Sequence, residues 1–146
     1  MNVIAPRCWN GDDDDAASEI DVGFLQKIIP GDGVMQITKI GDTARNIACS
    51  DLTEMVDQLE RLDKTDVNVY HACASFHDDK SRRADNVNSL KALYLDLDCG
   101  EGKASTGSGY ATQLDALEAL RDFCEKCGLP RPLIVDSGGG IHAYWP

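Results

Sequence analysis

Leucine alternates with tyrosine and then aspartate over residues 93–98, which read Leu-Tyr-Leu-Asp-Leu-Asp. Successive side chains of a β-strand point to opposite faces, so this alternation predicts a strand, over residues 90–97, with one apolar face. Asp96 and Asp98 share the other face at the end of the strand. Two carboxylates placed there repel each other, and a hard cation such as Mg²⁺ or Mn²⁺ would remove the repulsion. The alternative is a strand end that has reached solvent with two exposed aspartates.

Apolar periodicity and turn residues divide the remaining chain into further helices and strands. Apolar residues at helical spacing predict helices over residues 20–29, over residues 50–63 with Ser50 as the N-cap, and between Thr112 and Gly128. Runs rich in β-branched and aromatic residues predict four more strands, and polar or glycine-rich runs predict two loops. The strands are at residues 33–40, 67–76, 133–135 and 141–145, and the loops are at 77–86 and 99–109. This order of elements predicts a mixed α/β or α+β fold.

The chain of 146 residues has room for one domain of ordinary size, and its hydrophobic fraction of 42% is typical of folded globular proteins. Its 25 acidic and 14 basic residues give a net charge of −11, which argues against a broad phosphate-binding surface. Residues 1–19 contain a run of four aspartates and predict a flexible acidic arm. No apolar run is long enough to cross a bilayer, and residues 1–10 do not read as a signal peptide, so we expect a cytoplasmic protein.

Six cysteines raise the question of disulfides or a metal site. Without a secretory signal, reduced thiols are the better interpretation. The pair Cys124-x-x-Cys127 lies on a predicted helix with no second pair and no histidine nearby, so a zinc site there is a minor alternative. The six are Cys8, Cys49, Cys73, Cys99, Cys124 and Cys127.

A glycine-rich segment at residues 135–145, Val-Asp-Ser-Gly-Gly-Gly-Ile-His-Ala-Tyr-Trp, is the second candidate site. Three successive glycines let a ligand approach the main-chain N–H groups, which is how glycine-rich turns hold phosphate oxygens. The period of the following strand places His142 and Tyr144 on one face, opposite Ile141 and Trp145. The alternatives are a plain β-hairpin turn and a histidine with ordinary hydrogen bonds.

Together, residues 94–98 and 135–145 resemble the archaeo-eukaryotic primase superfamily, and more narrowly the primase-polymerase domains of phages and plasmids. The resemblance covers residues 90–146, whereas residues 20–76 match the N-terminal α/β module of that family only loosely. It implies an N-terminal α/β module followed by an RRM-like mixed sheet, which together form a primase-polymerase catalytic core over residues 20–146.

The motifs of this family can be matched residue by residue. Its first motif is an apolar strand that ends in an acidic pair, matched by Asp96 and Asp98. Its second is a small residue, any residue and then histidine at the start of a strand, matched by residues 140–142; the family often has serine where Gly140 stands. The third motif, an acid on a later strand, would lie beyond Pro146. We therefore expect a core that is incomplete at its C-terminus, and a chain that by itself binds a metal–nucleotide complex at most weakly and does not extend primers.

The resemblance implies nucleotidyl transfer in the initiation of DNA replication, in which a 3′-hydroxyl attacks the α-phosphate of a nucleoside triphosphate and pyrophosphate leaves. Mg²⁺ or Mn²⁺ would be held by Asp96 and Asp98, and His142 would be catalytic and hold the triphosphate. The implied partners are a single-stranded DNA template and a replicative helicase domain or subunit, in a bacterial or phage-infected host cell. Further substrate contacts are expected from Ser137, Gly138, Gly139, Gly140, Arg82, Arg83 and Lys103.

Two other functions fit parts of the pattern. Haloacid-dehalogenase-like phosphatases also place Asp-x-Asp after an apolar strand, but threonine usually follows where this chain has Cys99. A non-catalytic RRM-like nucleotide-binding or regulatory module would keep the motifs without turnover, although an aromatic content of 6% is low for a dedicated single-strand binder. Because a charge of −11 opposes template binding, we expect template contacts from residues beyond Pro146 or from partner subunits.

Overall fold

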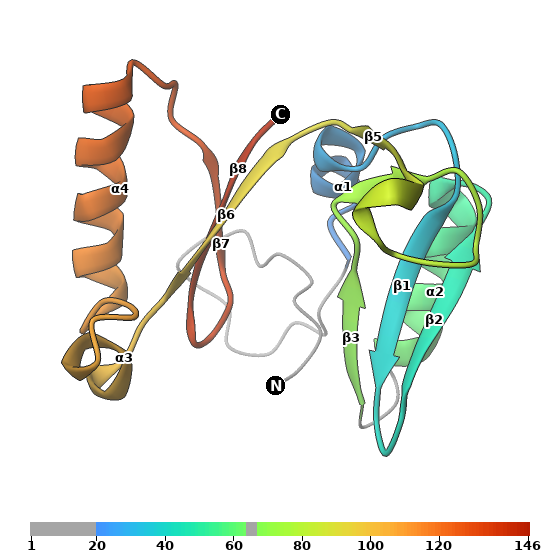
Figure 1. Ribbon diagram of the computed structural model, residues 1–146, viewed down its shortest axis with the longest axis horizontal. Helices are drawn as coiled ribbons and strands as arrows, with labels where there is room; N and C mark the ends of the chain where they lie inside the picture. Colours follow the sequence, from blue (N-terminus) through green and yellow to red (C-terminus); the bar gives the residue numbers. More distant parts are fainter. Residues whose placement is uncertain (1–19, 64–66) are drawn as a thin grey trace. The chain divides into compact units, whose positions relative to one another are not determined.

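The computed structural model describes residues 20–63 and 67–146 of the chain. These residues belong to two units, of which the first ends at Ala92 and the second spans Leu93–Pro146. Among them are four α-helices and eight strands, arranged in three antiparallel sheets (Figure 1). The prediction of a mixed fold of helices and strands is confirmed at this level. The predicted acidic arm over residues 1–19 lies outside the described residues.

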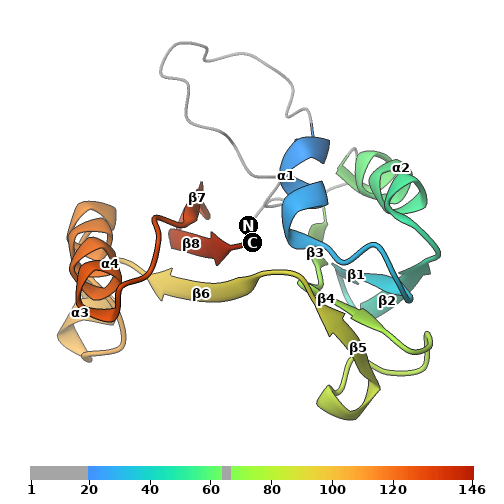
Figure 2. The same cartoon turned by 90° about the horizontal axis from the view of Figure 1, so that it is seen from above.

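The first unit combines two α-helices and a short 3-10 helix with five strands. In chain order these are α1 (Val22–Ile28), β1 (Met35–Ile40), β2 (Ala44–Cys49), α2 (Leu52–Asp63), β3 (Asn68–His71), β4 (Ala74–Phe76), the 3-10 helix η1 (Ala84–Asn86) and β5 (Val87–Leu90). β1 is the middle strand of the sheet β2-β1-β3, and β4 pairs with β5. α2 lies beside the three-stranded sheet in both views (Figures 1 and 2). Ile28, Ile37 and Met55, from α1, β1 and α2, are fully buried in this unit.

The N-terminus of α2 differs in detail from the sequence prediction. The N-cap is Asp51, whose Oδ1 accepts a hydrogen bond of 2.9 Å from the amide of Glu54. Ser50 instead donates its N–H and hydroxyl groups to Glu54 Oε2, at 2.7 and 2.8 Å. These hydrogen bonds lower the pKa of the Glu54 carboxyl. Asp51 takes the capping position because its short side chain, directly before the helix, reaches the third helical amide.

The second unit contains the remaining elements, which are β6 (Leu93–Asp98), α3 (Glu101–Ser105), α4 (Gln113–Cys127), β7 (Leu133–Asp136) and β8 (Gly140–Trp145). β8 lies between β6 and β7 and is antiparallel to both, so β6 and β7 run in the same direction and α4 connects them. α4 packs against one face of this sheet (Figure 1). The buried residues of this core are Leu97, Ile141 and Ala143 from the strands and Ala116, Leu120 and Cys124 from the helix.

Both ends of α4 are formed by the residues that the sequence predicts. The Thr112 hydroxyl accepts a hydrogen bond from the Asp115 amide, and the Asp115 carboxylate accepts one from the Thr112 amide, which completes a capping box. Gly128 ends the helix with a φ of 67°, a left-handed conformation that glycine adopts without a steric penalty. None of the helices in the described parts of the chain is long and apolar enough to cross a membrane.

Two runs that the sequence predicts as single strands are each divided in the structure. Residues 67–76 form β3 and β4 in different sheets, with a break at Ala72, whose N–H donates to Gln36 O. The run over residues 90–97 is split between β5 and β6, which begins at Leu93, and the boundary between the two units falls in the gap. Local periodicity does not reveal such breaks, because the residues at each break also fit a strand.

The sequence pattern does not predict β2 or α3. β2 pairs along its whole length with β1, from Met35 opposite Cys49 to Ile40 opposite Ala44. Most of its side chains are exposed, so it lacks the apolar alternation that marks a half-buried strand. α3 has five residues and lies inside the segment expected to be a loop, and one of the five is Gly102, a poor helix former.

The cysteines of the described residues form no disulfide with one another. Cys49 and Cys124 are buried, and burial raises the pKa of the Cys49 thiol to about 11. Cys127 is exposed. Cys124 belongs to the buried core between α4 and the sheet of the second unit.

Candidate functional site

The two sequence motifs meet on adjacent strands of the second unit. β6 and β8 pair so that Asp96 lies opposite His142 and Asp98 lies opposite Gly140. Because Leu97 and Ile141 pack toward α4, these four residues belong to the opposite face of the sheet. His142 Nε2 lies 3.6 Å from Asp96 Oδ1. Strand pairing thus brings the predicted acidic pair and the predicted histidine together, although they are far apart in the sequence.

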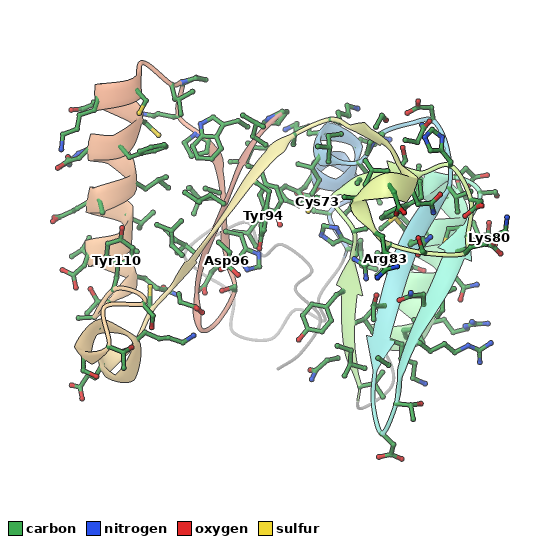
Figure 3. All side chains as sticks on the ribbon, in the orientation of Figure 1. Cys73, Lys80, Arg83, Tyr94, Asp96 and Tyr110 are labelled. Atoms are coloured by element: carbon green, nitrogen blue, oxygen red, sulfur yellow. The ribbon has the colours of Figure 1, made fainter. Side chains whose placement is uncertain are left out.

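Tyr94 is part of this site, and sequence reasoning did not select it. It lies two residues before Asp96 on β6, and therefore on the same face (Figure 3). The Tyr94 ring is 5.4 Å from the His142 ring in an edge-to-face arrangement and 5.1 Å from the Tyr144 ring. Tyr144 is buried and Tyr94 is 43% exposed. The two-residue period of the strand was the signal that could have identified Tyr94.

His142 is mostly enclosed by the protein. Its side chain is 13% exposed, and Nδ1 is buried without a hydrogen-bond partner among the described residues. Burial lowers the pKa of the imidazole below its usual value of 6.5, and the nearby Asp96 carboxylate opposes this shift only in part. The ring is therefore neutral at pH 7 and carries one N–H donor.

The titration of His142 provides a direct check of this environment. Followed by NMR, its midpoint is expected below pH 6.5, and Asp96→Asn is expected to lower it further by removing the charge that favours the imidazolium. Since the folded pKa is below the unfolded one, the stability that the neutral ring contributes is present above about pH 6.5 and is lost as the pH falls through the folded value. A midpoint above pH 6.5, or a rise in the Asp96→Asn variant, would contradict this geometry.

Asp98 lies at a tightly packed end of β6. A Cβ atom on Gly140 would lie 2.2 Å from Leu97 O, and one on Gly109 would lie 2.4 Å from Asp98 O, so both positions require glycine. The Asp98 side chain accepts a hydrogen bond from Lys103 Nζ at 2.7 Å. The segment that the sequence predicts as a flexible loop therefore folds back through α3 and places Lys103 at the acidic pair.

The glycine-rich turn between β7 and β8 is held by side chains around it. The Gly138 N–H donates to Asp136 Oδ1 at 2.7 Å, and the Ser137 N–H donates to Gly140 O at 3.1 Å. Gln113, the first residue of α4, donates to both Asp136 Oδ1 and Gly140 O. Two of the amides that a phosphate would use are thus already paired, and a phosphate at Gly138 would have to displace the Asp136 carboxylate.

Arg82 and Arg83 belong to the first unit, so they are not among the residues that β6 and β8 bring together. The Arg82 guanidinium donates to Thr38 Oγ1, and Thr38 in turn donates to Asn46 Oδ1 at 2.9 Å. Partial burial lowers the pKa of Arg82, although a guanidinium stays charged at neutral pH. Arg83 is exposed (Figure 3).

Asp96 and Asp98 carry oxygen donors of the kind that a hard cation prefers. The Asp96 and Asp98 side chains are 53% and 51% exposed, so both carboxylates are accessible. Among the described residues, no group of three or more histidine, cysteine and acidic side chains gathers as a metal site. Mg²⁺ is commonly held by one or two carboxylates together with water and substrate phosphates, so two protein carboxylates are a suitable donor set.

Comparisons with known proteins add no further identification. No family model, no curated protein and no solved structure has significant similarity to this chain. The residues of the site and their geometry are therefore what indicates the function of the chain.

Proposed function

We propose that this chain carries the nucleotidyl-transfer site of a DNA primase-polymerase. The observation that carries the proposal is the pairing of β6 with β8, which aligns Asp96 with His142 and Asp98 with the glycine-rich turn on one face of a sheet. An acidic pair that only marked a strand end would not require the histidine motif directly opposite it.

The topology of the second unit also supports the proposal. A helix joins β6 to β7, and the next strand, β8, inserts between them. A split β-α-β arrangement of this kind also occurs in ferredoxin-like and RRM-like sheets, which supports the proposal of an RRM-like sheet. The proposed catalytic core over residues 20–146 would contain this sheet preceded by the α/β elements of the first unit.

The residues of the site would divide the chemistry as follows. Asp96 and Asp98 would hold Mg²⁺ or Mn²⁺, which would neutralise charge on the transferred phosphate and activate the attacking oxygen. The 3′-hydroxyl oxygen would lose its proton to water and bond to the α-phosphorus as the bond to the bridging oxygen breaks, and pyrophosphate would leave. The neutral His142 would donate one N–H to the triphosphate.

The remaining partners belong to the same proposal. A single-stranded DNA template would need basic contacts, and the net charge of −11 makes a broad template surface on this chain unfavourable. Arg82 and Arg83 are the basic residues of the first unit that we propose for phosphate contacts. A replicative helicase domain or subunit would supply unwound template in the cytoplasm of a bacterial or phage-infected cell.

Calorimetric titration with nucleoside triphosphates tests the proposal. Binding of dATP or ATP is expected to be weak and to require Mg²⁺ or Mn²⁺, and it should disappear when EDTA removes the cation. Equal binding in EDTA would contradict the proposed site. Release of phosphate from a simple phosphate ester, without triphosphate binding, would favour a phosphatase instead.

A further inference from the structure

Lys103 already occupies one of the two carboxylates that the proposed metal site needs. Its Nζ donates a hydrogen bond to Asp98 Oδ2 at 2.7 Å. Asp96 instead lies beside His142, whose Nε2 is 3.6 Å from Asp96 Oδ1. The hydrogen-bonded ion pair of Lys103 is thus made with Asp98.

The backbone of Lys103 is held in place, while its charged group lies at the end of a flexible stem. The Lys103 N–H donates to Gly100 O, and its carbonyl accepts a hydrogen bond from the Ser108 N–H, both at 3.0 Å. A Cβ on Gly109 would lie 3.0 Å from Lys103 Cβ, so this segment packs closely at the base of the side chain. The Lys103 side chain itself is 48% exposed. The ammonium group can therefore move without any change in the fold.

An exposed ion pair of this kind is weak. Such pairs contribute little to stability, because water screens both charges and the long side chain loses freedom. A divalent cation bound by Asp96 and Asp98 would repel the ammonium group at close range. A triphosphate at the same site brings new negative oxygens, which form strong hydrogen bonds with an ammonium group.

We propose that the Lys103 ammonium group neutralises Asp98 before a metal ion binds, and that it then moves to the triphosphate of the incoming nucleotide. The inference rests on the proposed function and deepens it by linking metal binding to nucleotide binding. Metal alone has to displace Lys103 from Asp98. With nucleotide present, the displaced ammonium group gains a new partner, so the two ligands bind cooperatively through one side chain.

Lys103→Met tests this, because it keeps the length of the side chain and removes the charge. We expect the variant to bind Mn²⁺ alone about two- to five-fold more tightly, since the competing ion pair is gone. In saturating Mn²⁺ it should bind dATP and ATP about ten-fold or more weakly, since a charged hydrogen bond to phosphate is lost. Lys80→Met is the matched control, because Lys80 forms a similar exposed pair with Asp78 at 3.1 Å in the first unit.

Mn²⁺ binding at the site is followed by the broadening of the amide NMR signals of Leu97 and Gly140. These signals report on this site alone, whereas a bulk measurement would also detect Mn²⁺ bound elsewhere on a chain with 25 acidic residues. Tighter Mn²⁺ binding together with weaker nucleotide binding in Lys103→Met, with neither change in Lys80→Met, supports the proposal. Tighter binding of both ligands would overturn it, because Lys103 would then only compete with metal. Unchanged or weaker Mn²⁺ binding would also overturn it and would leave the proposed function standing.

The failure of the proposed function gives a different result. If Mn²⁺ broadens neither signal in the wild-type protein or in Lys103→Met, the metal site itself is absent and both proposals fail. Thermal unfolding of the three proteins serves as the folding check. The melting temperature of each variant should match that of the wild type, because both lysine side chains are exposed.

Discussion

Asp96→Asn and Asp98→Asn are each expected to reduce nucleotide incorporation at least about 100-fold in a form of the protein that incorporates nucleotides. The reason is that a metal ligand contributes several kcal/mol to stabilisation of the transition state, and each ~1.4 kcal/mol is a factor of ten in rate. The free energy of unfolding should change by no more than about 0.5 kcal/mol, because both side chains are about half exposed and their mutual repulsion is relieved. Primer extension and urea unfolding measure the two quantities.

Asp122→Asn is the matched control for this prediction. Asp122 lies on α4 of the same unit, is 54% exposed and forms an ion pair with Arg121 at 3.4 Å. Its replacement makes the same change in charge away from β6. Incorporation close to the wild-type rate by either Asp96→Asn or Asp98→Asn would refute the assigned metal ligands. An equal loss of activity in Asp122→Asn would show that net charge, and not the site, is responsible.

Gly140→Ala is expected to lower the free energy of unfolding by about 3 kcal/mol, the upper part of the range for overpacking a tight contact. The added Cβ would lie 2.2 Å from Leu97 O and 3.1 Å from Asp98 Cα, and both are backbone atoms that cannot rotate away. β6 and β8 would have to separate at the position where Asp98 faces the glycine-rich turn. Serine carries the same Cβ, so Gly140→Ser should be equally destabilising.

Gly138→Ala separates this steric effect from the conformational freedom of glycine. Gly138 has a φ of 78°, and a Cβ there would meet no atom within 4 Å. Alanine at that position should cost only about 1 kcal/mol, the penalty of a left-handed conformation. Urea unfolding followed by circular dichroism ranks the variants. A Gly138→Ala variant that is less stable than Gly140→Ala would show that the close approach of β6 and β8 is not what requires glycine.

Local periodicity in the amino-acid sequence was enough to predict the elements around the site. The alternation over residues 93–98 predicts that Asp96 and Asp98 share one face of a strand, and β6 has this arrangement. The ends of α4 follow from Thr112 and Gly128, because capping depends on residues next to one another in the chain. The glycine-rich turn and the strand after it were predictable for the same reason.

The contacts within the site depend on which strands and segments pair in three dimensions. The register of β6 and β8 puts Asp96 opposite His142, and no local pattern specifies that register. The same is true of Lys103, because its ion pair with Asp98 forms only when α3 folds back over the strand end. The boundary between the two units, after Ala92, likewise falls inside a run that the sequence predicts as one strand. Side-chain periodicity is a property of a few neighbouring residues, whereas strand pairing and burial depend on the free energy of the whole folded chain.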